Sequence, residues 1–355
     1  MLNEASVDVR AGVTAVAHPN IALVKYWGKR DESLALPVTG SLSVTLDIFA
    51  TTTHVTLAPP VPADMNGDAG LTGDVVTLNG RPAGGAAAER VQGFLDLVRA
   101  LAGRRERAVV ESVNQVPTGA GLASSAAGFA ALAAAASAAY GLDLDGRALS
   151  RLARRGSGSA CRSVFGGFVQ WHAGTGSGSA GDVSSFAEPV PVGPLDLALV
   201  VAVTDAGAKE VPSREAMRHT MATSPLYRAW AQASNTDLTR MRHALARGNL
   251  TAVGAIAEGN ALGMHAAMLA ARPAVRYLSA GSLAVLDAVN ALRADNVDAY
   301  ATADAGPNVV VLCPRADADR VAETVDAIEA VRSVHLARPG PGVRLRSERP
   351  GGDER

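Results

Sequence analysis

The chain has 355 residues, of which 48% are hydrophobic and 19% are charged. This composition is typical of a globular protein that forms one large domain or two fused halves, each with its own core. Its 33 Lys and Arg residues nearly balance 34 Asp and Glu residues, which argues against a general polyanion binder such as a nucleic-acid-binding protein, although a local basic pocket is compatible with this balance.

The first half of the chain is predicted to mix strands and helices. Residues 1–12 are polar and contain no apolar signal core, so we expect no targeting segment. Residues 41–57 alternate apolar and polar side chains, which predicts one long strand or two paired strands. An Asn-Gly pair within residues 75–83 predicts a hairpin, and apolar residues at helical spacing predict a helix over 86–101. Residues 109–116 predict a strand that leads into a glycine-rich loop.

The glycine-rich loop, PTGAGLASSAAG, occupies residues 117–128. It opens onto an alanine-rich run at 126–140, which is too short to span a bilayer and predicts a helix packed closely against a sheet. Inward-pointing backbone N–H groups and the helix N-terminus suit an anion such as phosphate. Ser124 and Ser125 could cap the helix or offer hydroxyls to phosphate and Mg²⁺. The residues alone support an ordinary turn equally well, and no lysine follows the glycines as in a P-loop.

The second half mixes strands and helices without strict βαβ alternation, which favours an α+β class over a doubly wound sheet. A Gly/Ser-rich segment at residues 174–185 predicts a flexible surface loop or a domain junction. The other predicted elements are a helix at 145–155, a buried strand at 195–203, two or three helices within 213–270, a helix at 283–293, strands at 298–303 and 309–312, and a helix at 317–330.

The two cysteines, Cys161 and Cys313, have no metal-site spacing and are too few for a disulfide scaffold. A reducing cytosol is the simplest compartment for such a chain. We therefore expect a cytoplasmic protein with no membrane or nucleic-acid partner.

Five segments, taken together and in order, resemble those of one enzyme family. The loop pattern Pro117-x-x-x-Gly121-Leu122-x-Ser124-Ser125 resembles the ATP-binding loop of the GHMP kinase superfamily, which includes galactokinase, homoserine kinase and mevalonate kinase. Kinases of this superfamily share the loop but not the segments KYWGK and SGSACRS. The four segments that resemble diphosphomevalonate decarboxylase are AHPNIALVKYWGKRDE at 17–32, GSLSVTLD at 40–47, GSGSACRSVFGGFVQW at 156–171 and DAGPNV at 304–309.

The resemblance implies a GHMP kinase fold, with an N-terminal half like ribosomal protein S5 domain 2 and a ferredoxin-like α/β C-terminal half. Residues 1–190 would form the domain that binds ATP and substrate, and residues 191–340 would form the C-terminal GHMP domain. The remaining residues, 341–355, are predicted to be a disordered tail. A homodimer is a further expectation from the resemblance.

The implied reaction is the ATP-dependent decarboxylation of mevalonate 5-diphosphate in the mevalonate pathway of isoprenoid biosynthesis. ATP, with Mg²⁺, would phosphorylate the tertiary 3-hydroxyl, and loss of phosphate and CO₂ would then give isopentenyl diphosphate. A relative that acts on mevalonate 5-phosphate, or a 3-hydroxyl kinase that does not decarboxylate, is the nearest alternative. A kinase of another small alcohol and a non-catalytic binding protein are more distant alternatives.

Three residues match the catalytic positions of the family. Asp304 would accept or orient the proton of the 3-hydroxyl, although by itself it is an ordinary turn former. Arg162 would bind the substrate carboxylate through a bidentate fork, although by itself it is equally compatible with a surface arginine. Lys25 would orient Asp304 and the 3-hydroxyl. His265 is expected to be structural.

Other residues match binding positions of the family. The substrate positions are Ala22, Tyr26, Lys29, Ser157, Ser159, Arg162 and Ser213, with Lys29, Ser157 and Ser159 directed at the 5-diphosphate. The ATP positions are Pro117, Gly119, Gly121, Leu122, Ser124 and Ser125, of which Ser125 would also contact Mg²⁺. The sequence departs from the family pattern at Gly119, Pro212, Ala216 and Ala303.

Overall fold

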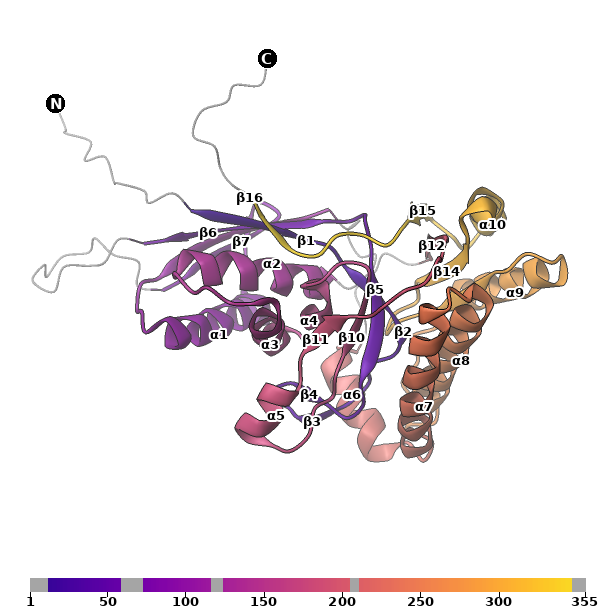
Figure 1. Cartoon of the computed structure of the whole chain (residues 1–355), viewed down its shortest axis with the longest axis horizontal. Helices are drawn as coiled ribbons and strands as arrows, with labels where there is room; N and C mark the ends of the chain where they lie inside the picture. Colours follow the sequence, from indigo (N-terminus) through magenta and orange to yellow (C-terminus); the bar gives the residue numbers. More distant parts are fainter. Residues whose placement is uncertain (1–11, 59–72, 116–123, 205–210, 347–355) are drawn as a thin grey trace, which may run out of the picture.

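A computed structural model describes residues 12–58, 73–115, 124–204 and 211–346 of the chain. The described strands form a six-stranded sheet, two four-stranded sheets and a two-stranded ribbon. The six-stranded sheet lies at one end of the molecule, and the long helices α7 (Tyr227–Ala246) and α8 (Leu250–Leu269) lie toward the other (Figure 1). Strands β2 (Asn20–Val24) and β5 (Ser41–Thr45) lie between them.

The six-stranded sheet has the order β16-β1-β6-β9-β7-β8 and is covered on one face by helices α1 and α2 (Figure 1). Its pairs are antiparallel except for β7 with β9. Alanines fill α2 and are buried on almost every side, so its backbone can lie close to β1 and β6 as expected. The elements are β16 (Arg344–Arg346), β1 (Val13–Ala17), β6 (Thr51–Leu57), β9 (Ala108–Asn114), β7 (Val75–Leu78), β8 (Arg81–Pro82), α1 (Gly85–Ala102) and α2 (Ser124–Ala139).

The middle sheet has the order β11-β10-β5-β2, with β2 at its edge. Short helices and the ribbon β3–β4 surround this sheet and contribute to the site described below. The elements are β11 (Ala187–Pro189), β10 (Phe168–Trp171), β5 (Ser41–Thr45), β2 (Asn20–Val24), β3 (Lys29–Asp31), β4 (Leu36–Pro37), α3 (Gly146–Gly156), α4 (Ala160–Ser163) and α5 (Gly178–Ser184).

The third sheet has the order β13-β14-β12-β15, and its central strand β12 is buried along its whole length. Alternate residues of β12 belong to two different cores: Leu199 packs with Met241 and Val253, whereas Val200 packs with Val285 and Val321. Helices therefore cover both faces of this sheet, as the continuous apolar run predicts. The elements are β13 (Tyr300–Thr302), β14 (Val309–Pro314), β12 (Leu197–Val203), β15 (Ser333–Ala337), α6 (Ser213–Thr223), α7 (Tyr227–Ala246), α8 (Leu250–Leu269), α9 (Ala280–Ala294), the 3₁₀ helix η1 (Arg315–Asp317) and α10 (Ala318–Asp326).

Three predictions about local structure need correction. Residues 41–57 form two strands in different sheets, β5 and β6, rather than one long strand or a pair. The Gly/Ser-rich segment 174–185 contains helix α5 rather than only a flexible loop. The tail predicted to be disordered from residue 341 contains β16, which pairs with β1, while residues 347–355 lie outside the described part of the chain. The strands take their hydrogen bonds from partners distant in the sequence, and α5 is held by ion pairs of Asp182 with Arg151 and Arg154. A local sequence window cannot predict such contacts.

Two glycines on α8 are expected to respond oppositely to an added methyl group. A Cβ at Gly254 would lie 2.1 Å from Cδ2 of Tyr300, whereas a Cβ at the exposed Gly259 would meet no atom within 4 Å. Gly254→Ala should therefore lower the free energy of unfolding by about 1–3 kcal/mol because of overpacking. Gly259→Ala should raise it by about 0.5–1 kcal/mol because alanine favours helix.

Urea unfolding of both variants beside the parent protein measures this pair of effects. Equal midpoints for Gly254→Ala and Gly259→Ala would contradict the close approach of α8 to β13.

Candidate active site

A partly buried ion pair joins two residues that are 279 positions apart in the sequence. Lys25 directly follows the edge strand β2, and its Nζ donates to Asp304 Oδ1 at 2.6 Å and to the carbonyl oxygen of Ala22 at 2.7 Å. The Lys25 side chain is 1% exposed, whereas that of Asp304 is 38% exposed. Burial lowers the pKa of Lys25, and the neighbouring Asp304 opposes this effect. The pair thus presents one open carboxylate above a buried ammonium group.

Arg162 lies on α4 and is only 2% exposed. Its guanidinium donates to neutral acceptors: Nη1 to Ser41 Oγ at 2.6 Å, Nε to Ser43 Oγ at 2.9 Å, and Nη2 to Asn20 Oδ1 at 3.1 Å. Among the residues that the structure describes, no carboxylate forms an ion pair with it. A buried cation with only neutral partners is suited to an anionic ligand.

Asp304 is close enough to Arg162 to influence its ionisation. Burial lowers the pKa of Arg162, and Cys161, Asp304 and Tyr26 oppose this effect. Arg162 in turn acts on the pKa of Lys25, which it lowers. Lys25, Arg162 and Asp304 therefore belong to one electrostatic neighbourhood, although they come from the end of β2, from α4 and from the turn after β13, respectively.

Tyr26 places a polar atom in this neighbourhood without a partner among the described residues. Its hydroxyl is buried and has no hydrogen-bond partner in the described part of the chain, and its ring meets Trp171 edge-on with 4.7 Å between centroids. Burial raises the pKa of Tyr26, so the hydroxyl stays neutral and can donate a hydrogen bond. A buried donor without an acceptor indicates a place for a ligand oxygen.

The segment GSGS lies against Tyr26, and Gly158 is the point of contact. A Cβ at Gly158 would lie 2.8 Å from both Cε1 and Oη of Tyr26. Gly158→Ala should therefore displace the ring or the segment and raise KM for the substrate about tenfold, a cost of about 1–2 kcal/mol. Steady-state kinetics measures this effect. Gly93→Ala on α1 is a matched control because Gly93 is exposed and its Cβ would meet no atom within 4 Å, and an equal rise in KM there would contradict the prediction.

Three cations gather where α3 ends at Gly156. Arg90 and Arg214 each donate to the carbonyl oxygen of Gly156 at 3.1 Å. Burial lowers the pKa of Lys29 and of Arg90, and Arg214 lowers both further. Glu32, 2.8 Å from Lys29, is the one carboxylate among their described ion-pair partners. This positive group suits a ligand with more than one negative charge.

Arg90 and Arg214 were not predicted from the sequence. Arg214 directly follows Ser213, which was predicted to be a substrate position, so its place in the sequence carried a usable signal. Arg90 lies in the first turns of α1 and belongs to none of the five matched segments. Only the packing of α1 beside α3 brings it to Gly156.

Of the remaining predicted binding residues, three serines have described contacts and most of the ATP-loop residues lie outside the described part of the chain. Ser157 Oγ lies 3.2 Å from Oγ of Ser125, so the GSGS segment meets the first turn of α2. Ser159 contributes its carbonyl oxygen to Asn20 at 3.1 Å. Ser213, at the first turn of α6, interacts with Tyr277. Pro117, Gly119, Gly121 and Leu122 lie outside the described residues, as does the side chain of Ser124.

A pocket of about 220 Å³ opens beside the start of α2. It lies between the helices α1 and α2 and strands β6, β7 and β9. Apolar side chains and a few polar groups share its lining, which is typical of a small-molecule site. Its lining includes Thr51, Asn79, Arg90, Asn114, Ser125 and Phe129.

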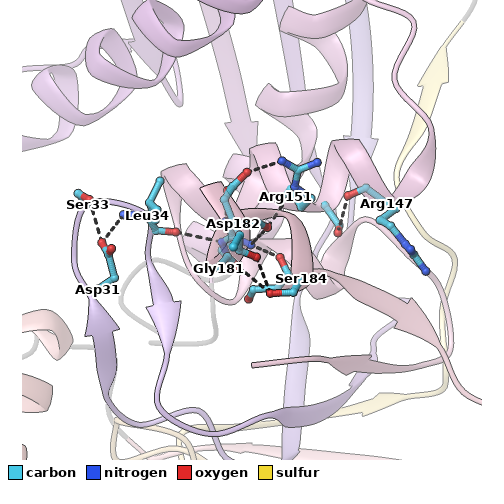
Figure 2. A network of polar contacts seen from close by, with 12 residues as sticks. Asp31, Ser33, Leu34, Arg147, Arg151, Gly181, Asp182 and Ser184 are labelled. Carbon is cyan, nitrogen blue, oxygen red and sulfur yellow. Dashed lines mark hydrogen bonds and ion pairs between the residues drawn. The ribbon is translucent and has the colours of Figure 1, made fainter. Parts of the chain in front are cut away.

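A polar network fixes the chain segment that follows Lys29. Asp31 Oδ1 accepts hydrogen bonds from Ser33 Oγ at 2.8 Å and from the amide of Leu34 at 2.9 Å, and Asp182 on α5 pairs with Arg151 on α3 (Figure 2). The fully buried Arg154 also pairs with Asp182 and donates from Nε to the Leu34 carbonyl at 3.0 Å. The ribbon that bears Lys29 is therefore tied to α3, the helix that leads into Gly156.

Comparison with known proteins identifies the family. A model of the diphosphomevalonate decarboxylase-like N-terminal domain matches residues 17–187, and a model of the mevalonate 5-diphosphate decarboxylase C-terminal domain matches residues 199–337. The chain belongs to the diphosphomevalonate decarboxylase family. The diphosphomevalonate decarboxylase of Homo sapiens is 37% identical over 344 residues, which cover 91% of this chain and 81% of the human protein.

Solved structures of diphosphomevalonate decarboxylases share the fold. A complex described as MDDEF with MVAPP, AMPPCP and magnesium is 42% identical, with a TM-score of 0.86 over 95% of this chain and 99% of that chain. The mevalonate diphosphate decarboxylase from Staphylococcus aureus is 37% identical, with a TM-score of 0.87 over 95% of this chain and 98% of that chain. The predicted family, the α+β class and the GHMP kinase fold are confirmed. Within the described ranges, no helix is both long and apolar enough to cross a bilayer.

Proposed function

We propose that this chain converts mevalonate 5-diphosphate and ATP into isopentenyl diphosphate, ADP, phosphate and CO₂. The observation that carries the proposal is the open Asp304 carboxylate, held by Lys25 in the same neighbourhood as an arginine that lacks an anionic partner among the described residues. A base for the 3-hydroxyl and a cation for the carboxylate are the two groups that this chemistry requires.

In this proposal Asp304 accepts the proton of the tertiary 3-hydroxyl as that oxygen is phosphorylated. Lys25 holds the carboxylate in place through the 2.6 Å contact. Arg162 binds the substrate carboxylate through the edge of its guanidinium, while Ser41, Ser43 and Asn20 fix the plane of the group. That orientation lets the C–C bond break toward the carbon that phosphate leaves, and burial excludes water from the developing positive charge.

The positive group at Gly156 fits the 5-diphosphate of the substrate. Lys29, Arg90 and Arg214 offset its charge, and Tyr26 supplies a neutral donor without a described partner. Arg90 also lines the pocket beside α2. It would therefore lie between the 5-diphosphate at Gly156 and the nucleotide bound in this pocket.

The residues fit ATP and Mg²⁺, which supply the phosphoryl group and offset the charge of its phosphates. The pocket beside α2 would hold the nucleoside, and the exposed Ser125 hydroxyl would face the phosphates and the ion. Within the described ranges no group of three His, Cys, Asp or Glu side chains could hold a metal ion. Oxygen atoms of the nucleotide would therefore supply most of the ligands of Mg²⁺.

Product analysis tests the proposal directly. The purified chain with ATP, Mg²⁺ and mevalonate 5-diphosphate should form isopentenyl diphosphate and CO₂ in equal amounts with ADP. Mevalonate 5-phosphate in a parallel reaction should give at least about tenfold lower kcat/KM, because one charged group fewer meets the three cations. ADP without CO₂ would contradict decarboxylation, and equal rates with both substrates would contradict the diphosphate assignment.

We also propose that each chain has two domains, with the boundary near residue 190, and that the protein is a cytoplasmic homodimer. The family-model ranges, 17–187 and 199–337, support this division, and the two free, buried thiols Cys161 and Cys313 suit a reducing compartment. The dimer is an expectation from the family resemblance alone, and light scattering of the purified protein tests it.

A further inference from the structure

Helix α8 contacts both strands that carry the ion pair of the candidate site. It packs against β2, which ends one residue before Lys25, and against β13, which ends two residues before Asp304. The close approach to β13 occurs at Gly254, where a side chain would meet the Tyr300 ring. The helix is therefore placed to set the distance between the two strand ends.

Asn260 on α8 holds the main chain of Lys25. Its Oδ1 accepts the Lys25 backbone N–H at 2.8 Å, and the residue is only 2% exposed. Strand β2 lies at the edge of its sheet, and its pairing with β5 is irregular between Ala22 and Val24. The Lys25 amide thus receives its acceptor from a side chain of the other half of the chain rather than from a strand.

The orientation of the Asn260 amide is set by its other contacts. Its Nδ2 donates to Asp237 Oδ2 at 2.9 Å and to Ser234 Oγ at 3.0 Å, both on α7. A carboxylate can only accept, so the NH₂ end must face Asp237 and the carbonyl oxygen must face Lys25. Asn260 is therefore a directed acceptor rather than a freely rotating amide.

His265, five residues further along α8, contacts the chain next to the other partner. Its Nε2 lies 3.3 Å from the carbonyl oxygen of Ala303, the residue before Asp304. Because a carbonyl oxygen only accepts, Nε2 carries the proton in this contact. Burial and, to a smaller extent, the charge of Lys25 lower the pKa of His265 to about 4, so the ring is neutral near pH 7.

We propose that Asn260 and His265 are positioning residues that hold Lys25 and Asp304 in register for catalysis. Each side chain fixes the backbone at or beside one partner of the ion pair, and both project from the same helix. Neither side chain is proposed to touch the substrate. The inference rests on the proposed function only in one respect, namely that Asp304 accepts the proton of the 3-hydroxyl during phosphorylation.

Asn260→Ala tests the first half of the proposal. Release of the Lys25 backbone should lower kcat about 10- to 100-fold, since a misplacement of about 1 Å can cost about 100-fold in rate. KM for mevalonate 5-diphosphate should change less than about threefold, because the cations at Gly156 are untouched.

The pH profile of kcat gives a readout that general destabilisation does not move. Among the described residues, Asp304 raises the pKa of Lys25 and Arg162 lowers it, while Lys25 in turn lowers the pKa of His265 on α8. A longer Lys25–Asp304 contact weakens the effect of Asp304. The basic limb of the kcat profile should therefore move to lower pH in Asn260→Ala.

The His265 variants test the second half with a conservative rescue. His265→Phe removes the donor to Ala303 and should lower kcat about tenfold, whereas His265→Gln keeps a donor at a similar position and should stay within about threefold of the parent. Equal kcat values for the two variants would overturn the role of His265.

Asn249→Ala is the matched control for Asn260→Ala. Asn249 caps the N-terminus of the same helix, where its side chain accepts a hydrogen bond from the Ala252 amide at 2.9 Å. It lies 11 residues before Asn260, the residue of α8 that bonds the Lys25 backbone. The control should lower Tm without changing kcat or its pH profile. An equal loss of kcat in both variants, or an unchanged kcat in Asn260→Ala, would overturn the proposal.

A crystal structure of Asn260→Ala separates this inference from the proposed function. A Lys25 Nζ–Asp304 Oδ1 distance beyond hydrogen-bonding range supports positioning by α8, and a distance that stays at 2.6 Å overturns it, whatever reaction the parent catalyses. Absence of CO₂ release by the parent protein would instead overturn the proposed function. Should Asn260→Ala not fold, the His265 pair with its own crystal structures decides between the same two outcomes.

Discussion

Asp304→Asn is expected to lower kcat for isopentenyl diphosphate formation by about 100- to 10,000-fold. An amide has the shape of the carboxylate but cannot accept the proton of the 3-hydroxyl, and general bases contribute about this much to rate. KM for ATP should change little, because the pocket beside α2 does not include Asp304. Steady-state assays of ADP, CO₂ and isopentenyl diphosphate measure the effect.

Asp295→Asn provides the control for Asp304→Asn. Asp295 is an acid in the same half of the chain with a side chain that is 71% exposed, so its neutralisation should leave kcat within about twofold. A kcat of Asp304→Asn within tenfold of the parent would contradict the role of this carboxylate as the base.

The same variant should change the pH dependence of stability. Of the described residues that act on the buried Lys25, Asp304 is the one that raises its pKa, so neutralisation of Asp304 lowers that pKa further below 10.5. The unfolded chain then binds more protons than the folded chain between the lowered pKa and 10.5, and stability rises with pH in this window. The Tm deficit of Asp304→Asn should therefore shrink as pH increases from 7 toward 10. A deficit that is constant with pH would contradict this account.

Arg162→Gln is expected to lower kcat/KM for mevalonate 5-diphosphate by about 30- to 5,000-fold. Loss of one partner of a buried, hydrogen-bonded charge pair costs about 2–5 kcal/mol, and here the missing partner would face the substrate carboxylate. Arg162→Lys should restore only a small part, because an ammonium group cannot span Ser41, Ser43 and Asn20 and present a second edge to the ligand.

Arg147→Gln is the matched control for the arginine variants. Its side chain is 59% exposed and lies 3.7 Å from Glu188, away from the ion pair, so its loss should leave kcat/KM nearly unchanged. Circular dichroism of each variant verifies folding. Full activity of Arg162→Lys would show that charge alone suffices and would contradict the bidentate role.

Short-range sequence signals predicted the elements whose causes are local. The Asn79-Gly80 pair predicts the β7–β8 hairpin because both residues adopt positive φ, 50° and 73°, which these residue types tolerate. The alanine run predicts α2, and the continuous apolar stretch predicts the doubly covered strand β12. The same signals could not separate β5 from β6, because period-2 alternation does not specify which sheet a strand joins.

The same distinction between local and tertiary causes applies to the site residues. The five segments that resemble the family contain Lys25, Arg162 and Asp304, so these positions could be predicted by matching motifs. Arg90, Asn260 and His265 lie on helices where nothing in the local sequence distinguishes a site residue from an ordinary helix position. Their contacts to Gly156, Lys25 and Ala303 arise only after the helices pack.

The sequence by itself determined the family, the α+β class and the identity of the chemical groups, because these depend on residue types at fixed spacing along the chain. The family resemblance already implied that Lys25 orients Asp304. The tertiary structure alone decided the form of this contact: the two residues, 279 apart in the sequence, meet at 2.6 Å with the lysine buried, the carboxylate 38% exposed and Arg162 within electrostatic reach. The burial of Lys25 and Arg162 and the distance between charged groups depend on which distant segments pack around them and exclude water. No local window of sequence contains that information.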